Sequence, residues 1–219
     1  MSDKLAYYHT LQDRSEGLFT DKGSKFICFA FPCVLESELK AEIERYRELH
    51  PKSRHVCHAW RSHPSVGISR SSDDGEPSGT AGKPMLQQLE SKDLYETALV
   101  CIRYFGGIKL GTPGLIRAYK QAARDALDHG HILRKEICQH YRIHGAPESI
   151  QVLMSIAKAL DMEIPGFDLQ DWQWMDLKIP LDREIELVEK MRSRFEKNRY
   201  EPGNGDFVLL NCRVEKTDR

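Results

Sequence analysis

The sequence predicts an α+β protein of two domains, an N-terminal domain over 1–136 and a ferredoxin-like domain over 137–219. Short apolar runs of strand length alternate with segments of helical periodicity along the whole chain. A second series of such elements begins after the charged triplet at 134–136. A chain of 219 residues is also long enough for one large or two modest domains.

The first domain begins with a predicted strand over 26–31, an aromatic-rich apolar run. A helix over 35–49 follows, because its apolar residues recur at helical spacing. Pro51 ends this pattern, and 54–61 predicts a strand with 65–69 as its hairpin partner.

A loop at 72–84 comes next, and Pro84 suits the first turn of a short helix. The nearly continuous apolar run 95–105 predicts a strand buried on both faces. A glycine-rich turn then leads to a helix with Thr112 as its N-cap, which we expect to run to about residue 129.

The second domain has the predicted order βαββαβ, which is the ferredoxin-like arrangement. Its expected elements are a strand over 139–144, a helix from 147, a short strand within 163–169, a strand over 172–179, a helix over 181–198 and a strand over 207–214. Trp172 and Trp174 share a strand face, where they could pack beneath a helix or stack on bases.

Composition excludes several classes of protein. No apolar run approaches the roughly 18 residues of a membrane span, and the N-terminus has no signal-peptide pattern, so we expect a cytoplasmic protein without membrane contact. The six cysteines are scattered and never form C-x-x-C, which argues against a disulfide framework or a zinc site. A net charge of -1 argues against general affinity for nucleic acid.

The distribution of charge is more informative, because the segment 97–124 contains five basic residues and no acid. Three of them, Arg117, Lys120 and Arg124, form one stripe of the helix, opposite Leu115 and Tyr119. A solvated face is the alternative, but such a face usually mixes both signs. A basic stripe beside a helix N-terminus favours an anion-binding site.

The turn before this helix supplies Gly106, Gly107, Gly111 and Gly114, and glycine lets a phosphate approach the backbone closely. Neither this turn nor the loop at 72–84 has a Rossmann or Walker pattern, so we expect no nucleotide cofactor.

The loop at 72–84 carries Asp73, Asp74 and Glu76. These acids could hold a divalent cation, but the flanking glycine and proline favour a turn whose carboxylates cap backbone amides, and we predict no metal site. A zinc site at His55, Cys57, His58 and His63 is also disfavoured, because on a strand His55 and Cys57 face opposite to His58. A Cys57–histidine nucleophile is disfavoured too, because the sequence shows no third partner that would orient such a pair. We therefore assign no catalytic residue.

Two long motifs stand in order along the chain, SDDGEPSGTAGKP at 72–84 and RYFGGIKLG at 103–111, the second followed by GLIRAY at 114–119. Together they resemble the signature of the IMPACT family, in its bacterial YigZ-type branch. The segment RHVCHAWR at 54–61 resembles the strand before the loop in that family. The resemblance covers about residues 15–130, and Pro113 departs from it, where many relatives have glycine.

The resemblance implies a first domain like domain 2 of ribosomal protein S5 and a second like the last domain of elongation factor G. Both folds recur in translation factors. Eukaryotic relatives carry an extra N-terminal domain and restrain an amino-acid-starvation kinase by competing for its activator. Only about twenty residues precede the first predicted strand here, so the kinase role is not carried over.

These observations lead to a hypothesis of a non-enzymatic protein that binds structured RNA or the ribosome and modulates translation. A small-molecule enzyme acting on a phosphorylated or acyl substrate, with Asp74 or Glu76 as base, is the alternative, and a protein-docking module is a third possibility. The oligomeric state is left open. The predicted nucleic-acid or anion-binding residues are Lys83, Arg103, Gly106, Gly107, Lys109, Thr112, Arg117, Lys120 and Arg124. The predicted functional-loop residues are Asp73, Asp74, Gly75, Glu76, Gly79, Thr80 and Gly82.

The loop at 72–84 is also expected to be exposed and to line one cleft with the turn at 106–114. Asp74 and Glu76 would pair there with Arg103 or Lys109. Such pairs would make the loop a gate that an anionic ligand opens by competing for the bases.

Overall fold

The structure is a computed structural model that describes residues 6–170, 173–196, 209 and 212–217. The chain divides into two compact units, one of residues Tyr8–Lys135 and the other of Glu136–Arg219 together with Met1–Tyr7. Each unit has an apolar core of its own. Within the described residues, no helix combines the length and the apolar character needed to cross a membrane.

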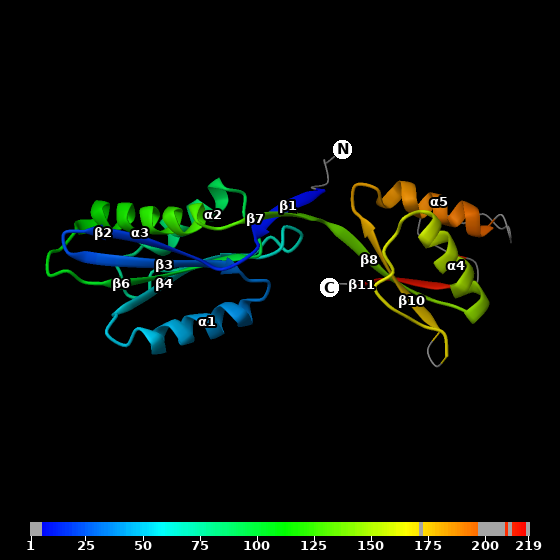
Figure 1. Cartoon of the computed structure of the whole chain (residues 1–219), viewed down its shortest axis with the longest axis horizontal. Coiled ribbons are helices and arrows are strands. Elements are labelled where there is room, and N and C mark those ends of the chain that lie inside the picture. Colours follow the sequence, from blue (N-terminus) through cyan, green and yellow to red (C-terminus); the bar gives the residue numbers. More distant parts are fainter. Residues whose placement is uncertain (1–5, 171–172, 197–208, 210–211, 218–219) are drawn as a thin grey trace. The chain divides into compact units, whose positions relative to one another are not determined.

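A five-stranded antiparallel sheet forms the centre of the unit Tyr8–Lys135 (Figure 1). Its strands lie in the spatial order β2 (Ser15–Asp21), β3 (Ser24–Pro32), β6 (Thr97–Tyr104), β4 (His55–Arg61) and β5 (Ser69–Ser72). One face is covered by α1 (Glu36–Leu49), the other by α2 (Gly82–Ser91) and α3 (Gly111–Asp128). A separate two-stranded sheet pairs β1 (Tyr7–Leu11) with β7 (Ile132–Glu136).

The unit has three layers, a sheet with helices on each face, and the side chains of the central strand β6 show why both faces need cover. Successive side chains of a strand point to opposite faces of its sheet. Accordingly, Leu99 and Cys101 pack in the core beneath α2 and α3, whereas Val100 and Ile102 pack in the core beneath α1. The prediction of a strand buried on both faces is confirmed, because every side chain from Thr97 to Ile102 is buried.

Helix α3 has the predicted amphipathic pattern, since Leu115, Tyr119, Ala122 and Ala126 are all buried. Its start differs from the prediction. The N-cap position is held by Leu110, and Thr112 is already the second helical residue, without a side-chain capping bond. A glycine can adopt the positive φ of 68° at position 111, so the N-cap lies two residues earlier than predicted.

Strands β1 and β2 lie in a segment for which the sequence predicted no structure. Strand β2 is at the edge of the sheet, and only Gly17 of its residues is buried, so it has no apolar run to reveal it. The hairpin partner expected at 65–69 begins only at Ser69. The preceding residues form a turn, closed by a 2.9 Å hydrogen bond from the Ser62 amide to the Ile68 carbonyl.

The unit that contains Glu136–Arg219 has the predicted element order βαββαβ, so the mixed α and β architecture is confirmed. Its elements are β8 (Cys138–His144), α4 (Pro147–Ala159), β9 (Phe167–Asp168), β10 (Trp174–Pro180), α5 (Glu184–Glu196) and β11 (Arg213–Thr217). The strands pair antiparallel in the order β11-β8-β10-β9, with α4 and α5 packed on the sheet. The last strand was expected to begin at 207, but residues 207 and 208 lie outside the described residues, as does Trp172.

Candidate nucleic-acid-binding cleft

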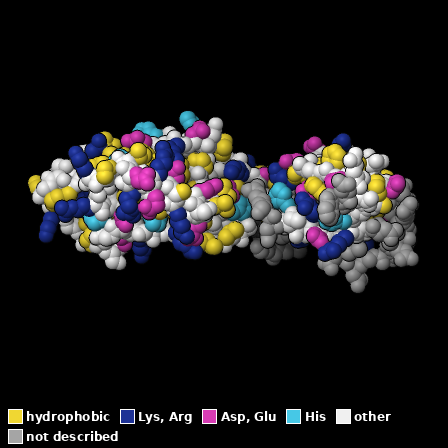
Figure 2. Space-filling model, turned by 90° about the horizontal axis from the view of Figure 1, so that it is seen from below, with side chains coloured by type: hydrophobic (Ala, Val, Ile, Leu, Met, Phe, Trp, Pro, Cys, Tyr) yellow, Lys and Arg dark blue, Asp and Glu magenta, His cyan; other side chains and the backbone are white. Residues whose placement is uncertain are grey.

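A cleft of about 720 Å³ lies beside the N-terminus of α3. Four segments line it: the turn between α1 and β4, the loop at 72–84, the end of β6, and the turn that leads into α3. The structure therefore brings the loop at 72–84 and the turn at 106–114 together in one cleft, as the sequence predicted. Figure 2 shows Lys and Arg side chains beside exposed hydrophobic ones at the end of the unit where these segments meet.

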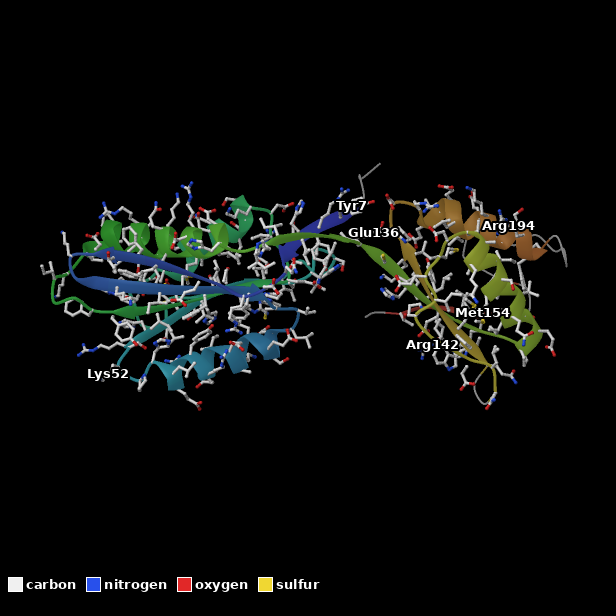
Figure 3. The ribbon with its side chains drawn as sticks, viewed as in Figure 1. Tyr7, Lys52, Glu136, Arg142, Met154 and Arg194 are labelled. Atoms are coloured by element: carbon white, nitrogen blue, oxygen red, sulfur yellow. The ribbon has the colours of Figure 1, made fainter. Side chains whose placement is uncertain are left out.

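The cleft carries an excess of positive charge. Lys52, which lies in the turn after α1 (Figure 3), lines it together with Arg54 and Lys109. None of these three side chains forms an ion pair with a described residue, whereas Arg103 in the same wall is paired with Glu76. The N-terminus of α3 adds partial positive charge, because its first turn contains no acid and no side chain caps it. An anion in the cleft would thus meet three free cations and a helix N-terminus.

The wall of the cleft contains a buried ion pair. Arg103 Nη1 donates to both carboxylate oxygens of Glu76, at 2.7 and 2.9 Å, and the Tyr119 hydroxyl donates to Glu76 Oε1 at 2.9 Å. The side chains of Glu76 and Arg103 are only 2% and 9% exposed. The expectation of an exposed loop is therefore wrong at Glu76, because partners from β6 and α3 satisfy this carboxylate inside the fold. It is also wrong at the end of the loop, where Thr80, Ala81, Gly82 and Pro84 are buried. A gate opened by competition for Arg103 would have to break this buried pair.

Asp73 caps the start of α2. Its carboxylate accepts hydrogen bonds from the backbone amides of Gly79, Ala81 and Gly82, at 2.8 to 2.9 Å. Partial burial alone would raise the pKa of Asp73, but these three hydrogen bonds outweigh that effect and hold the pKa below its ordinary value. The predicted turn, in which carboxylates cap backbone amides, is therefore confirmed at Asp73.

We predict that Asp73→Ala lowers the free energy of unfolding by about 1–2 kcal/mol at neutral pH, the usual cost of a lost cap. Because the folded-state pKa is depressed, the stabilisation by Asp73 is present above the unfolded pKa of about 3.9 and is lost as the pH falls. The stabilities of parent and variant, measured by denaturant titration, should accordingly begin to converge below about pH 4 and meet once the pH has fallen through the lowered folded-state pKa of Asp73. Asp13→Ala, at an exposed position, is the control. A difference that persists unchanged in acid would contradict this role of the carboxylate.

Asp74 does not line the cleft. It pairs with Arg47 of α1 at 3.2 Å and accepts a 2.6 Å hydrogen bond from the Val56 amide, so its predicted pairing with Arg103 or Lys109 is wrong. Gly75 follows it with φ +84°, which completes the turn. The three acids of the loop therefore diverge, and the described residues contain no cluster of potential ligands that could hold a metal ion.

The turn into α3 depends on close backbone contact. A Cβ atom at Gly106 would lie 1.9 Å from the carbonyl carbon of Gly23, and the Gly106 amide donates to Ser24 Oγ at 3.1 Å. Gly107 and Gly111 adopt positive φ, of 88° and 68°. The turn is therefore held against the β2–β3 hairpin at Gly106 and is open at Gly107, where no atom lies within 4 Å of a Cβ.

The basic stripe of α3 is partly neutralised. Arg117 pairs with Asp21 of β2 at 2.5 Å, and Arg124 pairs with Asp128 at 3.5 Å. A segment without acids in the sequence thus has acids beside it in space, which corrects the expected unbroken stripe. The three predicted lysines, Lys83, Lys109 and Lys120, form no ion pair with a described residue, whereas the three predicted arginines are paired.

The histidine and cysteine candidates separate as predicted. Cys57 packs in the core beneath α2 and α3, whereas His58 lies on the opposite face of β4 with Val56 and Trp60. Burial raises the pKa of the Cys57 thiol well above its ordinary value, so a thiolate nucleophile is disfavoured there.

Sequence reasoning missed Lys52, Arg54 and the aromatic pair Tyr104 and Phe105, all of which line the cleft. The two bases lie in the segment PKSR before β4. Lys52 follows the helix-ending Pro51 and Arg54 begins the predicted strand 54–61, so neither indicated a ligand site. The one signal of a binding role in the sequence was that two bases stand within three residues.

The Impact N-terminal domain family model matches residues 22–127. The chain is 33% identical over 175 residues to the Escherichia coli (strain K12) protein IMPACT family member YigZ, covering 78% of this chain and 84% of that protein. It is 38% identical over 133 residues to IMPACT family member YvyE of Bacillus subtilis (strain 168), and the match spans 61% of each chain, less than two thirds of the Bacillus protein.

A crystal structure described as that of a hypothetical protein matches with a TM-score of 0.69 and 30% sequence identity. The match covers 87% of this chain and 93% of that one.

Proposed function

Because this chain belongs to the IMPACT family, we propose that it is a non-enzymatic RNA- or ribosome-binding protein that modulates translation, with the cleft beside α3 as its phosphate-binding site. One observation carries this proposal: Lys52, Arg54 and Lys109 converge, without ion-pair partners among the described residues, on the N-terminus of α3. Unpaired cations and helix amides are the groups with which proteins hold phosphate.

The link to translation rests on the family resemblance. Its implied domains, like those of ribosomal protein S5 and elongation factor G, occur in proteins that work on RNA. A cytoplasmic site of action and a further protein partner fit the same proposal. Fold-level likeness alone does not specify a ligand, so the cleft provides the physical argument.

The geometry favours binding over the enzymatic alternative. That alternative needs Asp74 or Glu76 as a general base in the cleft. Asp74 does not line the cleft, and Glu76 is already engaged by Arg103 and Tyr119. Neither carboxylate is placed to take a proton from a bound substrate.

We expect a structured RNA to bind the full chain with an affinity that falls steeply with salt, since each phosphate contact releases counterions. Lys109→Gln and Arg54→Gln should each reduce the slope of log affinity against log salt by about one. Fluorescence anisotropy at several salt concentrations measures this.

Lys40→Gln is the matched control, because this exposed lysine of α1 pairs with Glu36 and does not line the cleft. Arg117→Gln should have a smaller effect than Lys109→Gln, since Arg117 is held by Asp21. A flat salt dependence, or absence of binding near about 50 mM salt, would refute the proposal.

A further inference from the structure

Two aromatic side chains that phosphate binding does not use line the cleft, one exposed and one partly buried. Phe105 lines the cleft and is 55% exposed, and Tyr104 lines it beside Phe105. A 2.8 Å hydrogen bond joins the Tyr104 hydroxyl to His50 Nδ1, which fixes the orientation of that ring. The guanidinium of Arg103 lies 5.5 Å from the Phe105 ring centroid. The exposed ring of Phe105, beside this oriented tyrosine and the Arg103 guanidinium, offers a stacking surface for a base.

The same cleft contains an unused buried donor. The Nε of Arg103 is buried and has no acceptor among the described residues, although the side chain lines the cleft and is only 9% exposed. Buried donors are almost always paired in folded proteins, so an unpaired one in a cleft wall indicates a place for a ligand acceptor. Arg103 lines the same cleft as Lys109 and the first residues of α3, whose N-terminus has no side-chain cap.

Resting on the proposed function, we infer that the cleft takes one unpaired nucleotide, with its phosphate at the N-terminus of α3 and its base on Phe105. The RNA bound there is therefore single-stranded at the point of contact, at an end, a loop or a bulge. A cleft of about 720 Å³ lies within the range of roughly 300–1,000 Å³ typical of small-ligand sites. In a continuous A-form duplex the bases are stacked and paired inside the helix, so none of them reaches a concave pocket.

The test compares two RNA probes on the full chain, a short single-stranded oligouridylate and a blunt RNA hairpin closed by a stable tetraloop whose bases are stacked. The oligouridylate should bind more tightly than the hairpin at equal salt. Phe105→Ala should weaken oligouridylate binding by about tenfold, the effect of one lost base–aromatic stack. It should leave the salt slope and the weak hairpin binding unchanged, because it removes no charge.

Ile108→Ala is the matched control. Ile108 lies in the same turn, is 56% exposed and does not line the cleft, so its truncation should leave both affinities unchanged. Equal losses of oligouridylate affinity in the Phe105 and Ile108 variants, or equal affinity of the parent for the two probes, would overturn the inference. The proposed function would stand in that case, because RNA still binds. Failure of both probes to bind would overturn the proposed function together with it.

Discussion

Glu76→Ala should lower the free energy of unfolding of the unit Tyr8–Lys135 by about 3–5 kcal/mol, because it leaves the buried guanidinium of Arg103 without its counter-charge. The Tyr119 hydroxyl loses its carboxylate acceptor in the same variant. Denaturant unfolding measures the free energy of unfolding of this unit through the fluorescence of Trp60, which is 3% exposed. The other two tryptophans are replaced by phenylalanine, so that only Trp60 reports.

Glu44→Ala is the matched control, since the Glu44 side chain is 71% exposed and its 3.8 Å pair with Arg47 is a surface contact worth about 0–1 kcal/mol. The double variant Glu76→Gln with Arg103→Met should recover part of the loss, because it removes both charges from the core. A Glu76→Ala protein as stable as the Glu44→Ala protein would show that the pair contributes nothing.

Gly106→Ala should destabilise the same unit by about 1–3 kcal/mol or more and also weaken RNA binding. The added Cβ would lie 1.9 Å from the carbonyl carbon of Gly23 and 2.1 Å from the Ser24 nitrogen, both backbone atoms that cannot rotate away. The β6–α3 turn must then separate from the β2–β3 hairpin. Because this turn carries Phe105 and Lys109 into the cleft, its displacement moves both proposed ligand contacts.

The neighbouring Gly107→Asn is the control for this prediction. Gly107 has φ +88°, which Asn tolerates better than most residues, and no atom lies within 4 Å of its Cβ. Thermal unfolding and oligouridylate anisotropy of the two variants should therefore separate clearly. A Gly106→Ala protein with the stability and RNA affinity of the parent would show that the turn is not held against the hairpin.

Some elements of the fold were predictable because a strong local pattern marks them. Strand β6 and helix α3 have apolar residues at the period of their secondary structure, and both form where expected. Strand β2 lacks such a pattern because it lies at the sheet edge with its side chains largely in solvent. In α3, the apolar stripe has such a pattern and was predicted correctly. The N-cap position has none, and its prediction was wrong.

The candidate site was predictable in part. The glycine-rich turn and the acidic loop were recognised by composition, and the structure places both beside one cleft. Lys52 and Arg54 were missed, since nothing at the junction between a helix and a strand indicates which distant segment it will meet.

The sequence by itself determined the series of helices and strands, the faces they bury and the family to which the chain belongs, because these depend on local periodicity and on contiguous motifs. Only the tertiary structure decided which charges are free. Arg117 meets Asp21 across 96 residues of sequence, and Arg103 meets Glu76 across 27. Charge neutralisation depends on distances of a few ångström in space, so an acid-free segment became a partly paired surface. Three of the cations without an ion-pair partner among the described residues, Lys52, Arg54 and Lys109, line the cleft at the start of α3.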